Sequence, residues 1–399
     1  MRKKTGVKAI FLGMLFCALL YFSNNFGLID IEKTAIITAV GIDLSEKVPE
    51  EYEVTVQIAI PQASATSQDN EKAVLSAEGA TVSEALHQIG DITGWYPNLS
   101  FCNLIVLGED MLAVDANVCL DYFAKTLKIQ YSACVAACEG KAKELLDAIT
   151  PLDNISSFAI QKILLKNPGM TSDVATVNIK NFSVGYYSPS SSAYMPYIRA
   201  VPAGRADGQS GETGGGQSGA QGGGEEEKVF DASFTALFKD GFFVGMLDDH
   251  ETKTFNLLKE SVKENFLIVD DVEIDGMKTD YLLNVTHNRC KMKLAVENGA
   301  PVLRVDARIF ARVEDRSTYE KREGLQSNAL MPEAVARKAE ENFVKYLSSI
   351  VKKSRESGCD VLELDNKLYR FNNADYAALR EDLYERLQLD VRVSFTGAK

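Results

Sequence analysis

Histidine and tryptophan are scarce in this 399-residue chain, which contains three of the former and one of the latter. The histidines His87, His250 and His287 include no pair with metal-ligand spacing, and His250 stands among acidic residues at the expected start of a helix. Walker, zincin and G-x-S-x-G motifs are absent. The sequence therefore predicts no catalytic residues, no cofactor-binding residues and no metal ligands. We expect a protein that is not an enzyme.

Positive charge is also in short supply, with 43 Lys and Arg residues against 56 Asp and Glu residues. Four of the basic residues, Arg2, Lys3, Lys4 and Lys8, precede the first apolar run, so the rest of the chain carries a charge of about −17. Recognition of nucleic acid starts from a basic patch, and adhesion to anionic lipid needs clustered basic residues. The composition therefore argues against nucleic acid and against wide electrostatic contact with a membrane.

The seven cysteines include no Cys-x-x-Cys pair. Cys134 and Cys138 lie in YSACVAAC, which predicts a strand. On a strand they stand about 13 Å apart, from a rise of about 3.3 Å per residue, which is too far for a mutual disulfide. We expect most cysteines to be small buried side chains. A disulfide among the six cysteines beyond Cys17 stays open, because sequence does not give the pairing.

Only one long apolar run is present, and it spans 21 uncharged residues, 9–29. A bilayer core needs about 20 mostly apolar residues, and the basic residues before the run favour a cytoplasmic N-terminus. Residues 1–29 therefore predict a basic head with a transmembrane anchor, and the rest of the chain is expected on the extracytoplasmic side. A cleaved signal peptide is the alternative, although no A-x-A-like cleavage site is present.

Residues 30–202 predict an N-terminal mixed α/β region. Thr34–Asp43 is apolar almost throughout, as a strand covered on both faces would be, and Tyr52–Ile60 alternates like a half-buried strand. The two should form a hairpin. Asp43 invites interpretation as a functional carboxylate, but a turn residue at the end of the first strand explains it more simply.

Helix signals follow these strands. Thr81 and Glu84 have the spacing of a capping box, and Asp110 is expected to cap a helix that ends near Lys125. Strands and helices then alternate up to residue 202.

Residues 203–228 predict a flexible linker between two independently folded parts, since Gly204–Gly224 contains ten glycines in 21 residues. A phosphate-binding glycine loop is disfavoured, because no GK[ST] sequence follows.

Residues 229–399 predict a second α/β region. Asp240-Gly241 and Asn298-Gly299 are hairpin turns. Separate strands are expected near Leu282–His287 and Cys290–Val296. Further elements are expected as helices at Asp249–Lys263, Pro332–Ser357 and Asp375–Leu387, and as a last strand around Val391–Phe395. The expected fold class is α+β, membrane-anchored, with two to three mixed α/β domains that each have a mainly antiparallel sheet and flanking helices.

Several segments resemble the Ger(x)C family, the C subunit of the spore germinant receptor. The segments are, in chain order, Ala35–Asp43 (AIITAVGID), Tyr52–Pro61 (YEVTVQIAIP), Gly140–Leu146 (GKAKELL), Phe242–Leu247 (FFVGML) and Val391–Gly397 (VRVSFTG). The resemblance, which rests on the order of these segments, extends over nearly the whole chain from about Thr34. The chain departs from the family at its attachment point, because Cys17 follows Phe16, which is too bulky for a lipobox.

The resemblance implies a non-enzymatic, lipoprotein-like receptor subunit needed for spore germination. Its implied partners are two integral membrane subunits, A and B, and its implied location is the outer face of the inner spore membrane. Whether this subunit contacts a small-molecule germinant stays open. One alternative is a membrane-anchored extracytoplasmic solute-binding protein, which would need a preformed cleft between lobes. An enzyme such as a wall hydrolase would need paired carboxylates that converge in a pocket.

Overall fold

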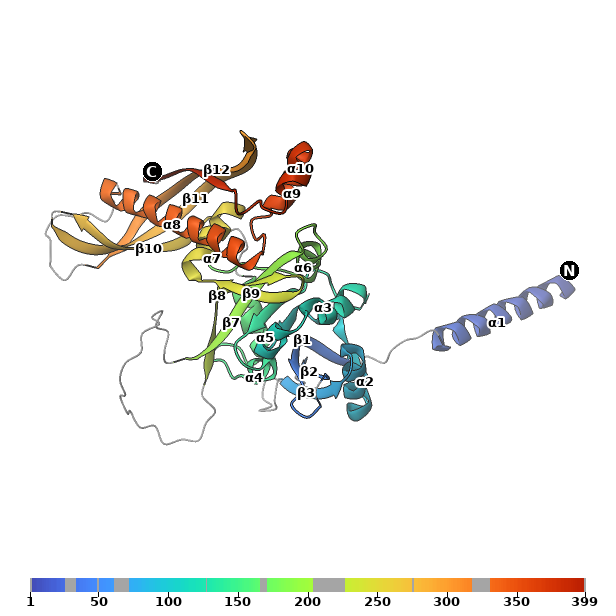
Figure 1. Cartoon of the computed structure of the whole chain (residues 1–399). Helices are drawn as coiled ribbons and strands as arrows, with labels where there is room; N and C mark the ends of the chain where they lie inside the picture. Colours follow the sequence, from blue (N-terminus) through green and yellow to red (C-terminus); the bar gives the residue numbers. More distant parts are fainter. Residues whose placement is uncertain are drawn as a thin grey trace, which may run out of the picture.

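The structure is a computed structural model that describes residues 2–25, 34–48, 50–60, 72–126, 128–165, 171–203, 227–274, 276–317 and 331–397. Its described part is an α+β fold with two sheets, as the sequence predicts (Figure 1).

The first sheet, sheet 1, is mixed and has the strand order β3-β2-β1-β5-β6-β7-β8-β9, with β4 paired to β1. Its centre, from β1 to β7, is parallel, and both flanks are antiparallel. The strands are β1 (Thr34–Leu44), β2 (Tyr52–Ala59), β3 (Lys72–Gly79), β4 (Tyr96–Asn98), β5 (Leu104–Leu107), β6 (Cys134–Cys138), β7 (Ser192–Pro202), β8 (Lys228–Lys239) and β9 (Phe242–Leu247).

Helices cover both faces of sheet 1, which explains why β5 and β6 at its centre are apolar throughout and why β1 is apolar at most positions. Val40 and Ile42 of β1 belong to one core, whereas Ala39 belongs to the core on the opposite face. The first core includes residues of α2 (Val82–Thr93), α3 (Ala116–Lys125) and α6 (Ile179–Tyr186), and the second includes residues of α4 (Ala142–Asp147) and α5 (Ser156–Leu164). The predicted hairpin of β1 and β2 is confirmed.

Sheet 2 has the order β10-β11-β12-β13. Its strands are β10 (Asn265–Ile274), β11 (Met277–Glu297), β12 (Ala300–Arg316) and β13 (Gln388–Gly397). Asn298 and Gly299 both have positive φ, which gives the predicted tight turn between β11 and β12. The expectation of separate strands at Leu282–His287 and Cys290–Val296 was wrong, because β11 runs through both in one piece. A register shift between Val285 and His287 absorbs the break in alternation that suggested two strands.

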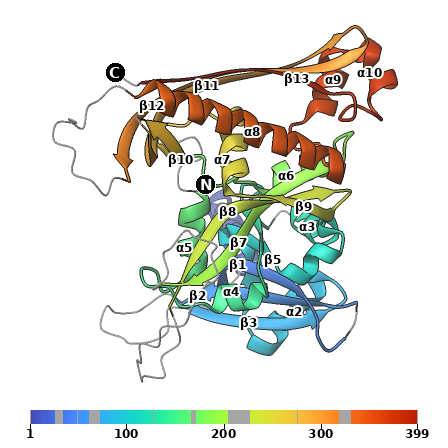
Figure 2. The same ribbon diagram turned by 60° about the vertical axis from the view of Figure 1, so that its left-hand side comes forward.

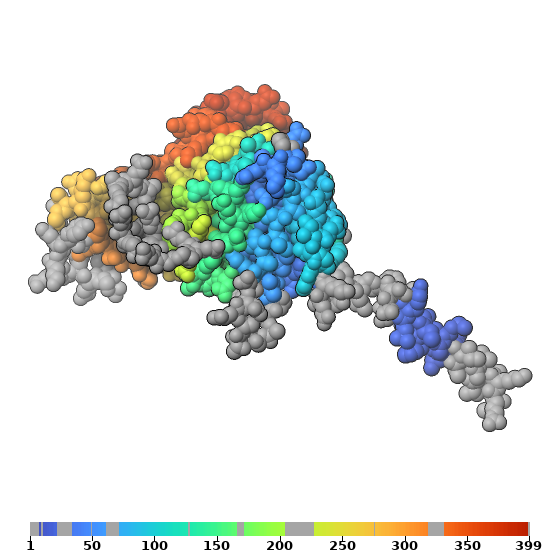
Figure 3. Space-filling view, turned by 90° about the horizontal axis from the view of Figure 1, so that it is seen from below, coloured from blue at the N-terminus to red at the C-terminus, as the bar shows by residue number. Residues whose placement is uncertain are grey.

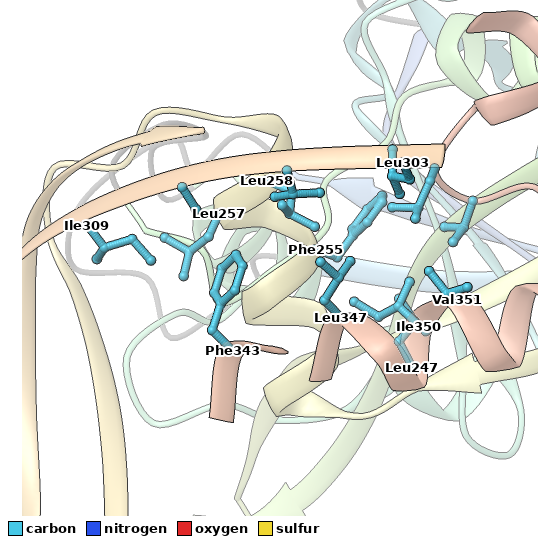
Figure 4. Close-up of a cluster of buried hydrophobic side chains, with 14 of the residues drawn as sticks. Leu247, Phe255, Leu257, Leu258, Leu303, Ile309, Phe343, Leu347, Ile350 and Val351 are labelled. Atoms are coloured by element: carbon cyan, nitrogen blue, oxygen red, sulfur yellow. The ribbon is translucent and has the colours of Figure 1, made fainter. Parts of the chain in front are cut away.

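One long helix, α8 (Glu333–Ser357), covers the inner face of sheet 2 and ends where Gly358 adopts a left-handed conformation. Figure 2 shows α8 between the strands of sheet 2 and the part of the chain that carries β8 and β9. Helix α7 (Asp249–Lys259) packs against it. Figure 4 shows the shared core, which includes Phe255, Leu257 and Leu258 of α7, Phe343, Leu347, Ile350 and Val351 of α8, and Leu303 and Ile309 of β12.

The glycine-rich segment does not divide the two sheets. Strands β7 and β8, on either side of it, pair antiparallel from Ser192↔Lys239 to Pro202↔Lys228. Strands β8 and β9 therefore complete sheet 1, which differs from the expectation that 203–228 separates independently folded parts. Most of that predicted linker, 204–226, lies outside the described residues.

Three helix predictions change at their ends. Asp110 begins no α-helix, because Glu109–Ala113 is a short 3₁₀ helix and Asp115 caps α3 instead. The helix expected at Asp249–Lys263 ends at Lys259. The helix expected at Asp375–Leu387 is shorter, because α10 (Asn373–Leu379) ends early and turns follow it, and α9 (Leu364–Phe371) before it was not predicted. The capping signal at α2 is confirmed, since Thr81 Oγ1 accepts the Glu84 N–H at 3.2 Å.

The N-terminal segment forms α1 (Arg2–Asn25). Of the helices in the described residues, none has both the length and the apolarity that crossing a membrane requires. The transmembrane prediction for 1–29 is therefore not confirmed, and residues 26–29 of it lie outside the described part of the chain.

Candidate functional site

Asp43, the carboxylate that stands out in the sequence, is completely buried inside β1. It accepts two backbone N–H groups at the start of α4, from Ala142 at 2.8 Å and from Lys143 at 3.1 Å. The expectation of a turn residue was therefore incomplete, because Asp43 closes a contact between β1 and a helix about 100 residues later. Its role is to satisfy the free N–H groups of a helix end.

Burial is the largest influence on this carboxyl group, and it raises the pKa of Asp43 to about 6 although the two backbone hydrogen bonds oppose the shift. The neighbouring Asp110 raises the pKa of Asp43 further, and Lys141 lowers it. Asp110 itself pairs with Lys141 at 2.7 Å and accepts the Leu44 N–H at 3.1 Å. The group thus ties β1, the 3₁₀ helix and α4 together. Since Asp43 has no exposed surface, it does not meet a ligand from solvent.

Two glycines make room for this arrangement. A Cβ atom added at Gly108 would lie 1.9 Å from Asp43 Oδ1, which is closer than two non-bonded atoms can approach. A Cβ on Gly41 would lie 3.1 Å from Ala142 Cβ, so β1 approaches α4 closely only with glycine there.

The histidines lie on three separate elements. His250 of α7 stacks on Tyr346 with ring centroids 5.0 Å apart, and His287 of β11 stacks on Phe310 at 5.9 Å. His87 lies on α2. Within the described ranges, His, Cys, Asp and Glu side chains form no group of three that could hold a metal ion.

The seven cysteines are all free thiols. Cys134 and Cys138, at the two ends of β6, are buried on the same face, as the strand prediction requires. Burial raises the pKa of Cys134 to about 11. Such thiols are protonated and unreactive at neutral pH.

A hollow of about 420 Å³ lies between α2 and the segment that carries β4. Gly94 in left-handed conformation ends α2 and turns the chain into Trp95 and Tyr96. Lys128 donates a hydrogen bond to the Tyr96 hydroxyl at 2.9 Å, and its ammonium lies 5.3 Å from the centre of that ring. The lining residues are Ser83, Leu86, His87, Gly90, Asp91, Gly94, Trp95, Tyr96, Pro97, Leu99, Tyr122 and Lys128.

This hollow offers aromatic faces, one amine, one imidazole and one carboxylate, so it is suited to binding through ring contacts. It holds no nucleophile paired with a base. The hollow is not among the sites predicted from the sequence, although the only tryptophan of the chain lies in it, followed directly by Tyr96. That pair was the available signal.

A second cavity of about 240 Å³ lies between α6, the start of β7, the end of α7 and the segment before α9. Lys259 of α7 contacts Tyr194 Oη at 3.2 Å and Glu363 Oε1 at 2.8 Å there. Burial lowers the pKa of Lys259, but the charges and hydrogen bonds of Tyr194 and Glu363 outweigh it and raise the pKa overall. The amine is therefore a fixed positive charge that joins β7, α7 and the turn before α9.

The family models divide the chain into two consecutive matches. Residues 28–200 match the spore germination protein N-terminal domain, and residues 233–396 match the spore germination B3/GerAC-like C-terminal domain. This chain belongs to the Ger(x)C family. Spore germination protein KC of Bacillus subtilis (strain 168) is 23% identical to this Ger(x)C protein over 351 residues, which cover 86% of this chain and 82% of the relative.

The fold of this Ger(x)C member agrees with a crystal structure of the GerBC protein. The two share a TM-score of 0.52 at 15% identity, over 93% of this chain and all of the other. This comparison supports the α+β architecture.

Proposed function

We propose that this protein is the extracytoplasmic C subunit of a nutrient germinant receptor and works with two integral membrane subunits, A and B, on the outer face of the inner spore membrane. The observation that carries the proposal is the pair of family matches, which cover the N-terminal and C-terminal halves in the order of the family. The described residues hold structural carboxylates and buried thiols in place of a catalytic set, so we propose a binding and assembly role without chemistry.

The proposal includes attachment to the membrane through the N-terminal segment. The support lies in α1, whose described apolar side chains are exposed on every side of the helix. A helix that is hydrophobic all round belongs in a membrane or in a deep core. These side chains are Phe11, Leu12, Met14, Leu15, Phe16, Leu19, Leu20 and Tyr21.

Deletion of the gene tests the function. Vegetative growth and sporulation should stay intact, germination in response to at least one nutrient should fall, and germination by agents that bypass receptors should persist. A normal nutrient response in the deletion strain, with no second copy to replace the protein, would refute the proposal.

A truncation that lacks Met1–Ile29 tests the attachment and should behave like the deletion. Tethering to the same membrane gives this subunit an effective concentration near its partners on the order of mM, which a free domain loses. An unrelated membrane anchor in place of residues 2–29 is the matched control and should restore the response. Failure of a folded, correctly placed swap would mean that the segment itself binds a partner.

A further inference from the structure

Ten consecutive residues, 92–101 (ITGWYPNLSF), carry no charge although a quarter of the chain is charged. Four large apolar side chains of this stretch are exposed, and we call them the aromatic patch. They are Ile92 (77% exposed), Trp95 (49%), Tyr96 (42%) and Phe101 (58%). Exposed apolar side chains gathered in one uncharged stretch indicate an interaction surface.

The patch lies beside the point where the chain enters sheet 1. Strand β4 runs parallel to β1 and pairs Thr34 with Tyr96 and Ile36 with Asn98. Figure 3 shows the blue-to-cyan part of the chain, to which α2 and β4 belong, on one flank of the molecule. Eight residues, 26–33, separate α1 from β1. Eight residues span at most about 30 Å, so Tyr96, the member of the patch that pairs with Thr34, stays within about that distance of the end of α1.

We infer that the aromatic patch of this protein rests in the headgroup region of the lipid bilayer. The inference rests on the proposed membrane attachment, which holds α1, and hence the patch, close to the lipid. Tryptophan and tyrosine are enriched at membrane–water interfaces because their rings are apolar and their N–H or O–H groups stay hydrated. The Lys128 amine on the Tyr96 ring supplies a donor for a lipid phosphate next to the rings.

Aromatic contact, and not charge, is the basis of this docking. The protein is strongly acidic, and the patch has no cluster of basic residues that would prefer anionic lipid. Zwitterionic phosphatidylcholine should therefore suffice, and added salt should change the contact little. The same docking directs sheet 2 away from the bilayer, because sheet 2 lies at the end of the molecule opposite α2 (Figure 1).

The single tryptophan makes the inference directly measurable, because all tryptophan emission of the full-length chain comes from Trp95. The full-length protein is reconstituted with phosphatidylcholine vesicles, with and without lipid brominated near the headgroup end of the acyl chains. Flotation with the vesicles reports attachment, and emission reports patch contact. We expect the protein to float, its emission to shift to shorter wavelength, and the brominated lipid to quench it.

Phe101→Asp should weaken the quenching while the protein still floats, since it places a charge in the patch. Phe371→Asp is the matched control, because Phe371 is 78% exposed on α9, and it should leave the quenching unchanged. Circular dichroism verifies that both variants fold. Equal quenching in the two variants would overturn the inference.

The two proposals fail in different ways. A protein that floats while Trp95 stays unquenched would refute the patch contact and leave attachment intact, as when a membrane-embedded partner subunit covers the patch instead. A protein that does not float would refute the attachment, and the patch inference with it.

Discussion

Replacing Asp43 by asparagine should change how the stability of the protein depends on pH. The asparagine keeps the size of the side chain and one accepting oxygen, but it removes the charge that burial penalises. In the wild-type protein this carboxyl has a pKa of about 6, against 3.8 for an ordinary aspartate. Desolvation is the main cause. The two N–H groups of α4 recover only part of its cost.

The sign follows from proton binding. The folded pKa lies above the unfolded pKa, so the folded state binds more protons between pH 3.8 and about 6. Stability contributed by Asp43 is therefore highest below that window, falls as the pH rises through it, and stays constant above it. The folded and unfolded pKa values of Asp43 differ by about two units, and each unit corresponds to about 1.4 kcal/mol. The unfolding free energy therefore changes by about 3 kcal/mol across the window.

The measurement is urea unfolding of the wild-type protein and of Asp43→Asn at several pH values from 3.5 to 7.5, a range set to bracket the window above. Other titrating groups, including Asp110, are common to both proteins, so the difference in unfolding free energy isolates Asp43. We expect the wild-type protein to lose about 3 kcal/mol relative to the variant across the window. The hydrogen bond lost by asparagine adds an offset that does not vary with pH. Parallel stability curves would refute the account of Asp43 as a desolvated cap.

Two further substitutions test the packing. Gly108→Ala should destabilise the protein by about 1–3 kcal/mol in denaturant unfolding, because its Cβ has no space beside the buried carboxylate, whereas Gly245→Ala, with nothing within 4 Å of its Cβ, should cost less than about 0.5 kcal/mol. Glu251, which is 2% exposed, bonds Lys353 of α8 at 2.5 Å, and Glu251→Ala should cost about 2–4 kcal/mol because it removes the carboxylate that neutralises a half-buried ammonium and that accepts the Asp248 N–H at the start of α7. Glu333, which forms an exposed ion pair on α8, serves as the control. Glu333→Ala should lower the unfolding free energy by about 0.5 kcal/mol or less, measured by thermal or urea unfolding. Equal losses within either pair of variants would contradict the packing described for that site.

Local patterns predicted most of the secondary structure because they depend on neighbours within a few residues. The apolar run of β1 predicted a strand covered on both faces, and the 3–4 spacing of apolar residues predicted α8 nearly to the residue. Asn298-Gly299 predicted its hairpin, because few other residues adopt positive φ at both turn positions. Errors occurred where two signals competed locally, as at Asp110 and Asp115, which both precede a helical pattern.

The candidate site was much less accessible to sequence reasoning. Trp95 and Tyr96 become a surface only because β4 pairs with β1, about 60 residues earlier in the chain, and because α2 ends at Gly94. The hollow also needs Lys128 and Tyr122, which arrive from α3 and the loop after it. Contacts between distant segments leave no trace in the periodicity of the sequence, so the residues of this hollow could not be grouped from the sequence.

The sequence by itself determined the family, the α+β class, the central strands and the long helix, because these depend on short-range pattern and on residue order. The tertiary structure decided which strands share a sheet. Residues 203–228 have the composition of a linker, yet β7 and β8 on either side pair with each other, since unpaired strand edges and apolar faces find partners regardless of the loop between them. The tertiary structure also decided the role of Asp43, because its partners Ala142 and Lys143 lie about 100 residues away in the chain. A buried carboxylate is stabilised only by the groups around it, and those groups are brought together by folding.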